Sequence, residues 1–139
     1  MIQKSSETLL LPPEARSSSM SRRFVEHALS RWQLEAMSDV AVLLTSELVT
    51  NAIVHAQTEV AVTITRDDPR TITVAVSDGS RSEPRLHRHS DDAATGRGLG
   101  ILDALASSWG VLSGTDGKTV TFTLCHPAVP EAPSPVDLR

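Results

Sequence analysis

Hydrophobic and polar residues alternate along three stretches of the chain, and this two-residue period is typical of half-buried strands. The stretches span residues 60–65, 71–76 and 119–124, where large apolar residues alternate with threonine or alanine. Residues 7–11 and 109–113 are also interpreted as strands. With one apolar face and one threonine-rich face, these strands predict a largely antiparallel sheet that is covered on one side only.

An apolar period near four residues predicts helices in the intervening segments. The apolar positions of the first helix are Met20, Phe24, Ala28 and Trp32, and it is expected to begin near the Pro12–Pro13 pair. The second helix follows Ser38–Asp39, which can cap its N-terminus, and runs to His55 or Ala56. A third, shorter helix opens within residues 96–100. The predicted fold class is therefore α+β, a two-layer α/β sandwich with a mixed, mostly antiparallel sheet and helices on one face.

The chain has 139 residues and is expected to form one domain with an ordinary globular composition of 40% hydrophobic and 22% charged residues. Residues 1–6 are predicted to be a disordered N-terminus. Residues 127–139 contain four prolines and no apolar period, which indicates a disordered tail. The predicted domain therefore spans residues 7–126.

Charge and cysteine content limit the classes of function. A net charge of −4, no basic stripe, and only two Phe and two Trp argue against direct nucleic-acid binding. Cys125 is the single cysteine, so no internal disulfide forms, which fits a reducing compartment. We find no apolar run near the roughly 20 residues of a membrane span and no secretory signal. The protein is expected to be cytoplasmic, without membrane association.

Three polar residues recur at intervals of four in the second predicted helix, namely Glu47, Asn51 and His55. At about 100° per residue they share one stripe of the helix. An apolar stripe of Leu44, Leu48 and Ala52 runs parallel to it. A carboxylate, a carboxamide and an imidazole beside a core-facing stripe indicate the floor of a polar pocket, although a solvated helix face has the same pattern.

Two motifs downstream favour a pocket. Asp78 ends a predicted strand directly before Gly79, and a buried carboxylate there could accept a hydrogen bond from an exocyclic amine; a simple Asp-Gly turn is the alternative. The run Gly96-x-Gly98-x-Gly100 opens the third helix, where backbone N–H groups can meet phosphate oxygens, or where glycine simply permits a turn. The irregular segment 77–98 has a length typical of functional or disordered loops.

Four motifs in this order resemble the N, G1 and G2 boxes and the closing Gly-Thr element of the GHKL (Bergerat-fold) ATPase family. They are Glu47-x3-Asn51-x3-His55, Asp78-Gly79, Gly96-x-Gly98-Leu99-Gly100 and Gly117-Lys118-Thr119. That family includes gyrase B, ATP-dependent heat-shock chaperones, histidine kinases and MutL. Residues 46–52 and 96–100 are most similar to the small anti-sigma factor serine/threonine kinases of the RsbW and SpoIIAB kind, in their actinobacterial form.

The resemblance covers about residues 7–125 and implies a histidine kinase-like domain that binds ATP with Mg²⁺. Such a domain would phosphorylate a serine on an anti-anti-sigma (STAS-type) partner and sequester a sigma factor, and small members of the family often form homodimers. Glu47 would be the catalytic general base and Asn51 a Mg²⁺ ligand. Asp78 would bind the adenine amine with help from the Thr119 hydroxyl. The remaining nucleotide-binding positions would be His55, Gly79, Gly96, Arg97, Gly98, Leu99 and Gly100.

One position departs from the family pattern, which usually has Asp-x-Gly in the G1 box. Ser80 stands where the second glycine is expected, and serine is strained in backbone conformations with positive φ. Nucleotide binding is therefore expected more firmly than turnover. The alternatives are a non-catalytic regulator, nucleotide-gated or nucleotide-independent, that binds a protein, and an ATPase module of a larger complex. His87, His89 and the Asp91–Asp92 pair give a weaker alternative, a metal site in the loop.

Overall fold

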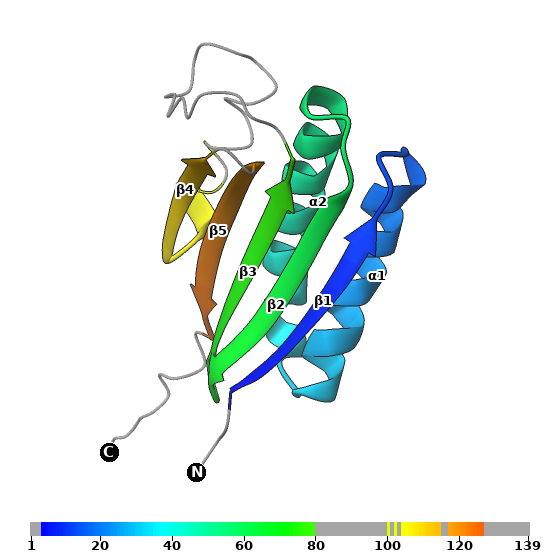
Figure 1. The fold of residues 1–139 in the computed structure, drawn as a ribbon. Helices are drawn as coiled ribbons and strands as arrows, with labels where there is room; N and C mark the ends of the chain where they lie inside the picture. The colour runs from blue at the N-terminus through cyan, green and yellow to red at the C-terminus, as the bar shows by residue number, and fades with distance from the viewer. Residues whose placement is uncertain (1–3, 80–99, 101, 103, 115–116, 127–139) are drawn as a thin grey trace, which may run out of the picture.

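The computed structural model describes residues 4–79, 100, 102, 104–114 and 117–126 of the chain. The helical elements are α1 (Arg16–Arg31), the 3₁₀ turn η1 (Glu35–Met37) and α2 (Ser38–His55). The strands are β1 (Ser5–Leu11), β2 (Val60–Asp68), β3 (Thr71–Asp78), β4 (Ser108–Gly114) and β5 (Gly117–Cys125). They form one sheet in the order β1-β2-β3-β5-β4, and each neighbouring pair is antiparallel. Figure 1 shows α1 and α2 together behind the sheet, which confirms the predicted two-layer α+β fold.

The described elements follow the predicted order, with shifts at their ends. α1 begins at Arg16, a few residues after the proline pair, and its C-cap is Trp32. β3 runs on to Asp78, so that this residue closes the strand as expected. The third predicted helix is seen in part: its described residues Gly100, Leu102, Ala104 and Leu105 are helical. The tail 127–139 lies outside the described residues.

The start of α2 corrects one expectation. Ser38 and Asp39 were expected to cap the helix, but η1 runs directly into α2, Met37 occupies the N-cap position, and no side chain makes a capping hydrogen bond there. Leu34 and Met37 are buried on either side of this turn. A cap contributes about 1 kcal/mol and burial of a large apolar side chain about 1.5–3 kcal/mol, so packing outweighs the cap.

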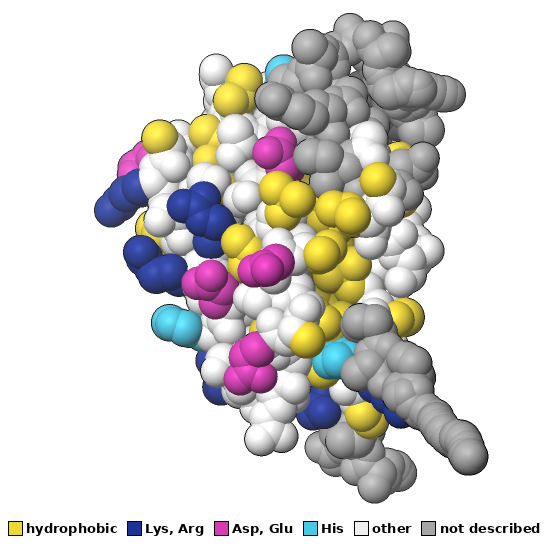
Figure 2. Space-filling model, turned by 180° about the vertical axis from the view of Figure 1, so that it is seen from behind, with side chains coloured by type: hydrophobic (Ala, Val, Ile, Leu, Met, Phe, Trp, Pro, Cys, Tyr) yellow, Lys and Arg dark blue, Asp and Glu magenta, His cyan; other side chains and the backbone are white. Residues whose placement is uncertain are grey.

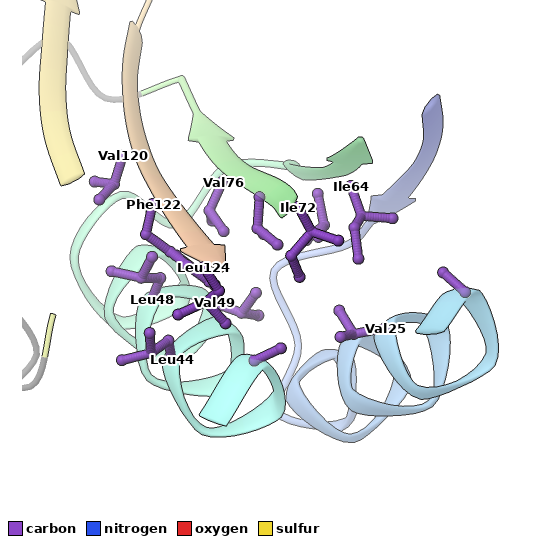
Figure 3. Packing of buried hydrophobic residues seen from close by; sticks show 14 of the residues in the cluster. Val25, Leu44, Leu48, Val49, Ile64, Ile72, Val76, Val120, Phe122 and Leu124 are labelled. Carbon is purple, nitrogen blue, oxygen red and sulfur yellow. The ribbon is translucent and has the colours of Figure 1, made fainter. Parts of the chain in front are cut away.

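The core lies between the helices and one face of the sheet. Along β3 every second residue is buried, which gives the strand one apolar face towards the helices. The register extends this face across the sheet, because Val76 pairs with Val62 on one side and with Val120 on the other. Figure 3 shows side chains from the two layers converging, among them Val25, Leu44, Leu48 and Val49 from the helices and Ile64, Ile72, Val76, Val120, Phe122 and Leu124 from the sheet.

The opposite face of the sheet carries hydroxyl groups. They pair across strands as Ser6–Thr65 (3.0 Å), Thr8–Thr63 (2.9 Å), Thr73–Thr123 (3.1 Å) and Ser77–Thr119 (2.8 Å), measured between side-chain oxygens. Neither α1 nor α2 covers this face, and Figure 1 shows both helices behind the sheet. The predicted arrangement of one apolar and one threonine-rich face is thus observed.

One helical stretch, residues 35–55, is long and apolar enough to span a membrane by length and composition, with a mean hydropathy of 1.4. This corrects the expectation from the sequence that no apolar run comes near the length of a membrane span. In the structure its inner side is part of the core, with Ala41, Leu44, Val49 and Ala52 buried. A core helix of a globular domain can have the same length and apolarity. Here the apolar residues on the inner side pack against the sheet, whereas Leu43 and Val54 are exposed.

Candidate functional site

Three chain segments meet at one end of the molecule. β3 ends there at Asp78, β5 begins there at Gly117, and α2 ends on the same side at His55 (Figure 1). The β3–β5 register brings Asp78 and Lys118 opposite each other. A hydrogen bond joins the segment after α2 to the end of β3, because the Gly79 N–H donates to the Thr58 hydroxyl at 2.8 Å. The helix and the two strands are therefore physically connected at this end.

Asp78 is a charged residue in a buried position. Its exposed fraction is 8%, and the alternation of β3 places it on the covered face together with Val76. Aspartate is almost never fully buried in proteins without specific partners. A carboxylate at the end of a strand, on the face that the helices cover, can accept hydrogen bonds from a ligand that enters from this end. Asp78 is therefore not part of a solvent-exposed Asp-Gly turn, and its role in a nucleotide pocket stays a prediction.

The polar stripe of α2 lies beside the core, on the side of the helix away from α1. The hydroxyls of Ser18 in α1 and Thr50 in α2 are 3.2 Å apart, which identifies the side of α2 that contacts α1. Asn51 is rotated by about 100° from Thr50 and so lies on a different side of α2 from the contact with α1. Asn51 and Glu47 are both half-buried.

His55 continues this stripe in sequence, but its side chain is exposed. The structure therefore brings Glu47 and Asn51 together next to the core and leaves the imidazole at the solvent-facing end of α2. Figure 2 views the helical layer and shows basic and acidic side chains intermixed towards one edge, with a group of hydrophobic side chains beside them in the middle of this face.

Thr119 does not share the face of Asp78. It pairs in register with Ser77, one residue before Asp78, and its hydroxyl lies 2.8 Å from the Ser77 hydroxyl on the uncovered face. The sequence analysis expected this hydroxyl beside the adenine. Because side chains alternate along a strand, the residue that the register brings to Asp78 is Lys118. Lys118 could have been found from sequence, since it is two residues before Val120 in the alternating apolar series.

The structure also identifies Thr58, which the sequence analysis did not. Its hydroxyl accepts the Gly79 N–H, and its methyl carbon lies 3.3 Å from the place that a Cβ on Gly79 would take. No sequence motif contains Thr58; the only signal is its place in the short connection between the predicted second helix and the next strand. Its role depends on a contact between residues 21 positions apart.

The glycine-rich run falls largely outside the described residues. Gly96, Arg97, Gly98 and Leu99 are in the undescribed part of the chain, as are Ser80 and the histidines of the loop. Gly100 is helical and exposed, and a Cβ there would meet nothing within 4 Å. Leu102, two residues further on, is fully buried in the core. The C-terminal side of this run is thus anchored to the domain.

Metal-ligating side chains do not cluster in the described part of the chain. No cluster of three or more His, Cys, Asp or Glu side chains lies close enough to hold a metal ion there. Among the described residues, the half-buried side-chain amide of Asn51 offers an oxygen of the kind that Mg²⁺ prefers.

Comparisons with known proteins agree with this geometry. A family model described as the histidine kinase-like ATPase domain matches residues 11–124. No curated protein matches the chain. Among solved structures, the RsbU and RsbW domains of Rv1364c from Mycobacterium tuberculosis are similar, with a TM-score of 0.63 and 18% sequence identity. That match covers 87% of this chain and 32% of the other, and at this identity it shows a shared fold. Because the family model spans most of its length, the chain belongs to the histidine kinase-like ATPase domain family.

Proposed function

We propose that the protein binds ATP with Mg²⁺ and transfers a phosphoryl group to a serine of an anti-anti-sigma (STAS-type) protein, and that it also sequesters a sigma factor. The observation that carries the proposal is the placement of Glu47 and Asn51 on the edge of α2 beside the core, in a domain where the buried Asp78 ends β3. Family membership supports ATP binding in general. The transfer of a phosphoryl group and the identity of the two protein partners are the parts that we propose.

The residues at this end of the domain fit an adenine nucleotide. The carboxylate of Asp78 accepts hydrogen bonds and so suits the exocyclic amine of adenine. The side-chain oxygen of Asn51 is a hard ligand suited to Mg²⁺, which would share phosphate oxygens of the nucleotide. Backbone N–H groups of the run 96–100 would bind the phosphates at the start of a helix. Bound ATP would supply the phosphoryl group, and Mg²⁺ would offset its negative charge.

Glu47 is the residue that we assign to proton transfer. Its carboxylate would accept the proton of the partner's serine hydroxyl as the serine oxygen attacks the γ-phosphorus of ATP. The bond between that phosphorus and the bridging oxygen breaks, and ADP leaves. Glu47 lies one helical turn before Asn51 and is half-buried, so its side chain is restricted yet reachable from outside. In this arrangement Asn51 positions the ion, and Glu47 acts on the incoming hydroxyl next to it.

The test compares two isosteric variants in a phosphate-transfer assay. We expect Glu47→Gln to lower transfer from radiolabelled ATP to a STAS-type protein at least about 100-fold, the range of a lost general base, while the ATP dissociation constant changes by less than about threefold. Glu59→Gln, which alters an exposed glutamate just after α2, is the matched control and should leave both unchanged. Equal transfer by wild type and Glu47→Gln would refute the assignment of the base.

A second candidate function is a regulator that binds a protein partner without catalysis. Ser80, in place of the usual glycine after Asp78-Gly79, favours this alternative because it can alter the turn at the adenine side. Isothermal titration with ATP and ADP in Mg²⁺ separates the two. Saturable binding without transfer to any STAS-type partner supports a nucleotide-gated regulator. Absence of binding to both nucleotides supports a nucleotide-independent one and contradicts the kinase.

Partner choice is proposed from the resemblance to RsbW-type regulators and from the similar structure, which contains an RsbW domain. This chain spans about a third of that structure's chain, so the whole protein's activity is not carried over. Co-purification of the protein with purified sigma factors and STAS-type proteins, with and without ATP, tests the proposed partners. Light scattering on the free protein tests the expected homodimer.

A further inference from the structure

We infer that Thr58 is a positioning residue that holds the backbone beside Asp78 and thereby sets the selectivity of the site for a 6-aminopurine. This inference rests on the proposed ATP site. Thr58 lies outside all of the motifs on which that proposal depends, and its role follows from contacts at the junction of α2, β3 and β5. The residues that make these contacts, Thr58, Gly79 and Gly117, all belong to the described part of the chain.

The hydroxyl of Thr58 is used both as donor and as acceptor. It accepts the hydrogen bond of the Gly79 N–H at 2.8 Å and donates to the carbonyl oxygen of Glu59 at 3.2 Å. A hydroxyl has one hydrogen to donate, so the bond to Glu59 directs a lone pair towards Gly79. The peptide group immediately after Asp78 is thus held by a side chain of defined orientation.

The backbone before Thr58 is itself tightly turned. The N–H groups of Ala56 and Gln57 both donate to the carbonyl of Ala52, at 2.8 and 3.3 Å, and Gln57 has φ of 56°, a left-handed conformation that ends the helix. β2 then starts at Val60. Thr58 is therefore anchored three residues after the end of α2 and two residues before the start of β2, which makes it a firm support for Gly79.

The backbone of β5 approaches the same segment closely. Gly117, the first residue of β5, has φ of 140°, and a Cβ there would come within 2.0 Å of the Asp78 carbonyl oxygen and 3.1 Å of the Gly79 Cα. The Asp78–Gly79 backbone thus lies between Thr58 and Gly117. With neighbours this close at Thr58 and at the start of β5, the backbone from which the Asp78 side chain leaves the strand has little room to move.

The consequence is a prediction about base selectivity. A fixed carboxylate accepts a hydrogen bond from the 6-amino group of adenine but faces the 6-oxo group of hypoxanthine with two acceptors opposed. A site built to bond one group rejects the analogue that lacks it, because its polar atoms are left unpaired. Loss of the support at Thr58 should therefore weaken ATP binding and leave binding of inosine triphosphate nearly unchanged, which general destabilisation would not do.

The experiment measures dissociation constants for ATP and inosine triphosphate by calorimetry, for the wild type and four variants. Thr58→Val keeps the shape but removes the hydroxyl, Thr58→Ala is a second variant without it, and Thr58→Ser retains it. Thr63→Val is the matched control, since Thr63 pairs with Thr8 on the uncovered face. The preference for ATP is the dissociation constant of inosine triphosphate divided by that of ATP. We expect Thr58→Val and Thr58→Ala to lower this ratio about threefold to tenfold, as for one net hydrogen bond. Thr58→Ser and Thr63→Val should keep the wild-type ratio.

The outcomes separate this inference from the proposed function. A wild type that binds neither nucleotide would overturn both. A wild type that prefers ATP, together with Thr58→Val and Thr58→Ala proteins that keep this preference or lose affinity for both nucleotides equally, would overturn the role of Thr58 alone. Thermal unfolding of each variant shows that the compared proteins are folded.

Discussion

At the scale of single residues, the alternation of a strand decides which side chains share the face of Asp78. Lys118 pairs with Asp78, whereas Thr119 pairs with Ser77 and is turned to the uncovered face. A shift by one residue exchanges the two faces of a strand. The motif at the start of β5 therefore has to be interpreted through the register, because its sequence alone does not show which of its side chains lies next to the carboxylate.

From this register we predict that Thr119→Val leaves the ATP dissociation constant within about twofold of the wild type. The variant loses the hydroxyl pair with Ser77, so the free energy of unfolding should fall by about 0.5–1.5 kcal/mol. Calorimetry and urea denaturation measure the two effects. Asp78→Asn is the positive control and should weaken ATP binding strongly. A large loss of ATP affinity in Thr119→Val would mean that this hydroxyl does reach the nucleotide.

A second residue-scale prediction concerns Thr45, which is fully buried in α2. Among the residues that the structure describes, its hydroxyl has no hydrogen-bond partner. A buried unpaired hydroxyl is unfavourable, and valine has the same shape and a similar helix propensity. Thr45→Val should therefore raise the free energy of unfolding by about 0.5–1.5 kcal/mol in urea denaturation. Thr63→Val, which loses a paired hydroxyl, should lower it. Destabilisation by Thr45→Val would reveal a partner for this group.

At the scale of elements, the β2–β3 hairpin contains a carboxylate with a shifted pKa. The backbone N–H of Arg70 donates to Asp68 Oδ1 at 2.8 Å. This bond, with a second from the Thr71 side chain, lowers the pKa of Asp68 from its ordinary value of 3.8. The ionised form is thus favoured by folding, and its contribution to stability is present above the ordinary pKa and lost as pH falls through the folded-state value.

We expect Asp68→Asn, which keeps an acceptor for the Arg70 amide but carries no charge, to remove this pH dependence. The difference in stability between wild type and variant should be larger at pH 7 than under acidic conditions, because the wild-type carboxylate becomes protonated as pH falls through its lowered folded-state pKa. Urea denaturation under the two conditions measures the difference. An NMR titration that gives Asp68 a pKa at or above its ordinary value would contradict the prediction.

The meeting of β3 and β5 gives another element-scale prediction. Gly117 has positive φ, and any Cβ there would collide with the Asp78 carbonyl oxygen. Gly117→Ala should lower the free energy of unfolding by at least about 1–3 kcal/mol from backbone strain alone. Gly110→Ala is the control, because a Cβ at Gly110 in β4 meets nothing within 4 Å. Equal stability of the two variants in urea denaturation would contradict this account of the β3–β5 junction.

At the scale of the whole molecule, the site depends on the packing of the two layers. Phe122 of β5 is fully buried and, like Leu48 of α2, lies in the core between the sheet and the helices (Figure 3). The same core fixes α2, which carries Glu47 and Asn51, relative to the strands that carry Asp78 and Lys118. Stability and the geometry of the proposed site are therefore coupled through the core.

This coupling predicts that Phe122→Ala lowers the free energy of unfolding by about 3–5 kcal/mol, because it removes a large buried side chain and leaves a cavity. Leu112→Ala is the control: Leu112 is 74% exposed on β4, and its removal should change stability by less than about 0.5 kcal/mol. Thermal and urea unfolding measure both variants. Similar stability of the two would show that the core is not organised around Phe122.

Much of the fold could be predicted from the sequence because its signals are local. Alternating residues at 60–65, 71–76 and 119–124 carry the strand period, and the spacing of Met20, Phe24 and Ala28 carries that of a helix. The family could be identified because Glu47, Asn51 and Asp78 are in motifs of fixed spacing. The start of α2 could not be predicted, because burial of Met37 and Leu34 outweighs the caps that Ser38 and Asp39 offer.

By itself, the sequence determined the strands, the helices, the face of each that is apolar, and the residue types that could hold a nucleotide. Only the tertiary structure decided which residues meet: Asp78 with Lys118 rather than Thr119, and Gly79 with Thr58. The physical reason is that periodicity is a property of neighbouring residues, whereas register and the contact between a helix end and a distant strand end are set by packing between segments far apart in the chain.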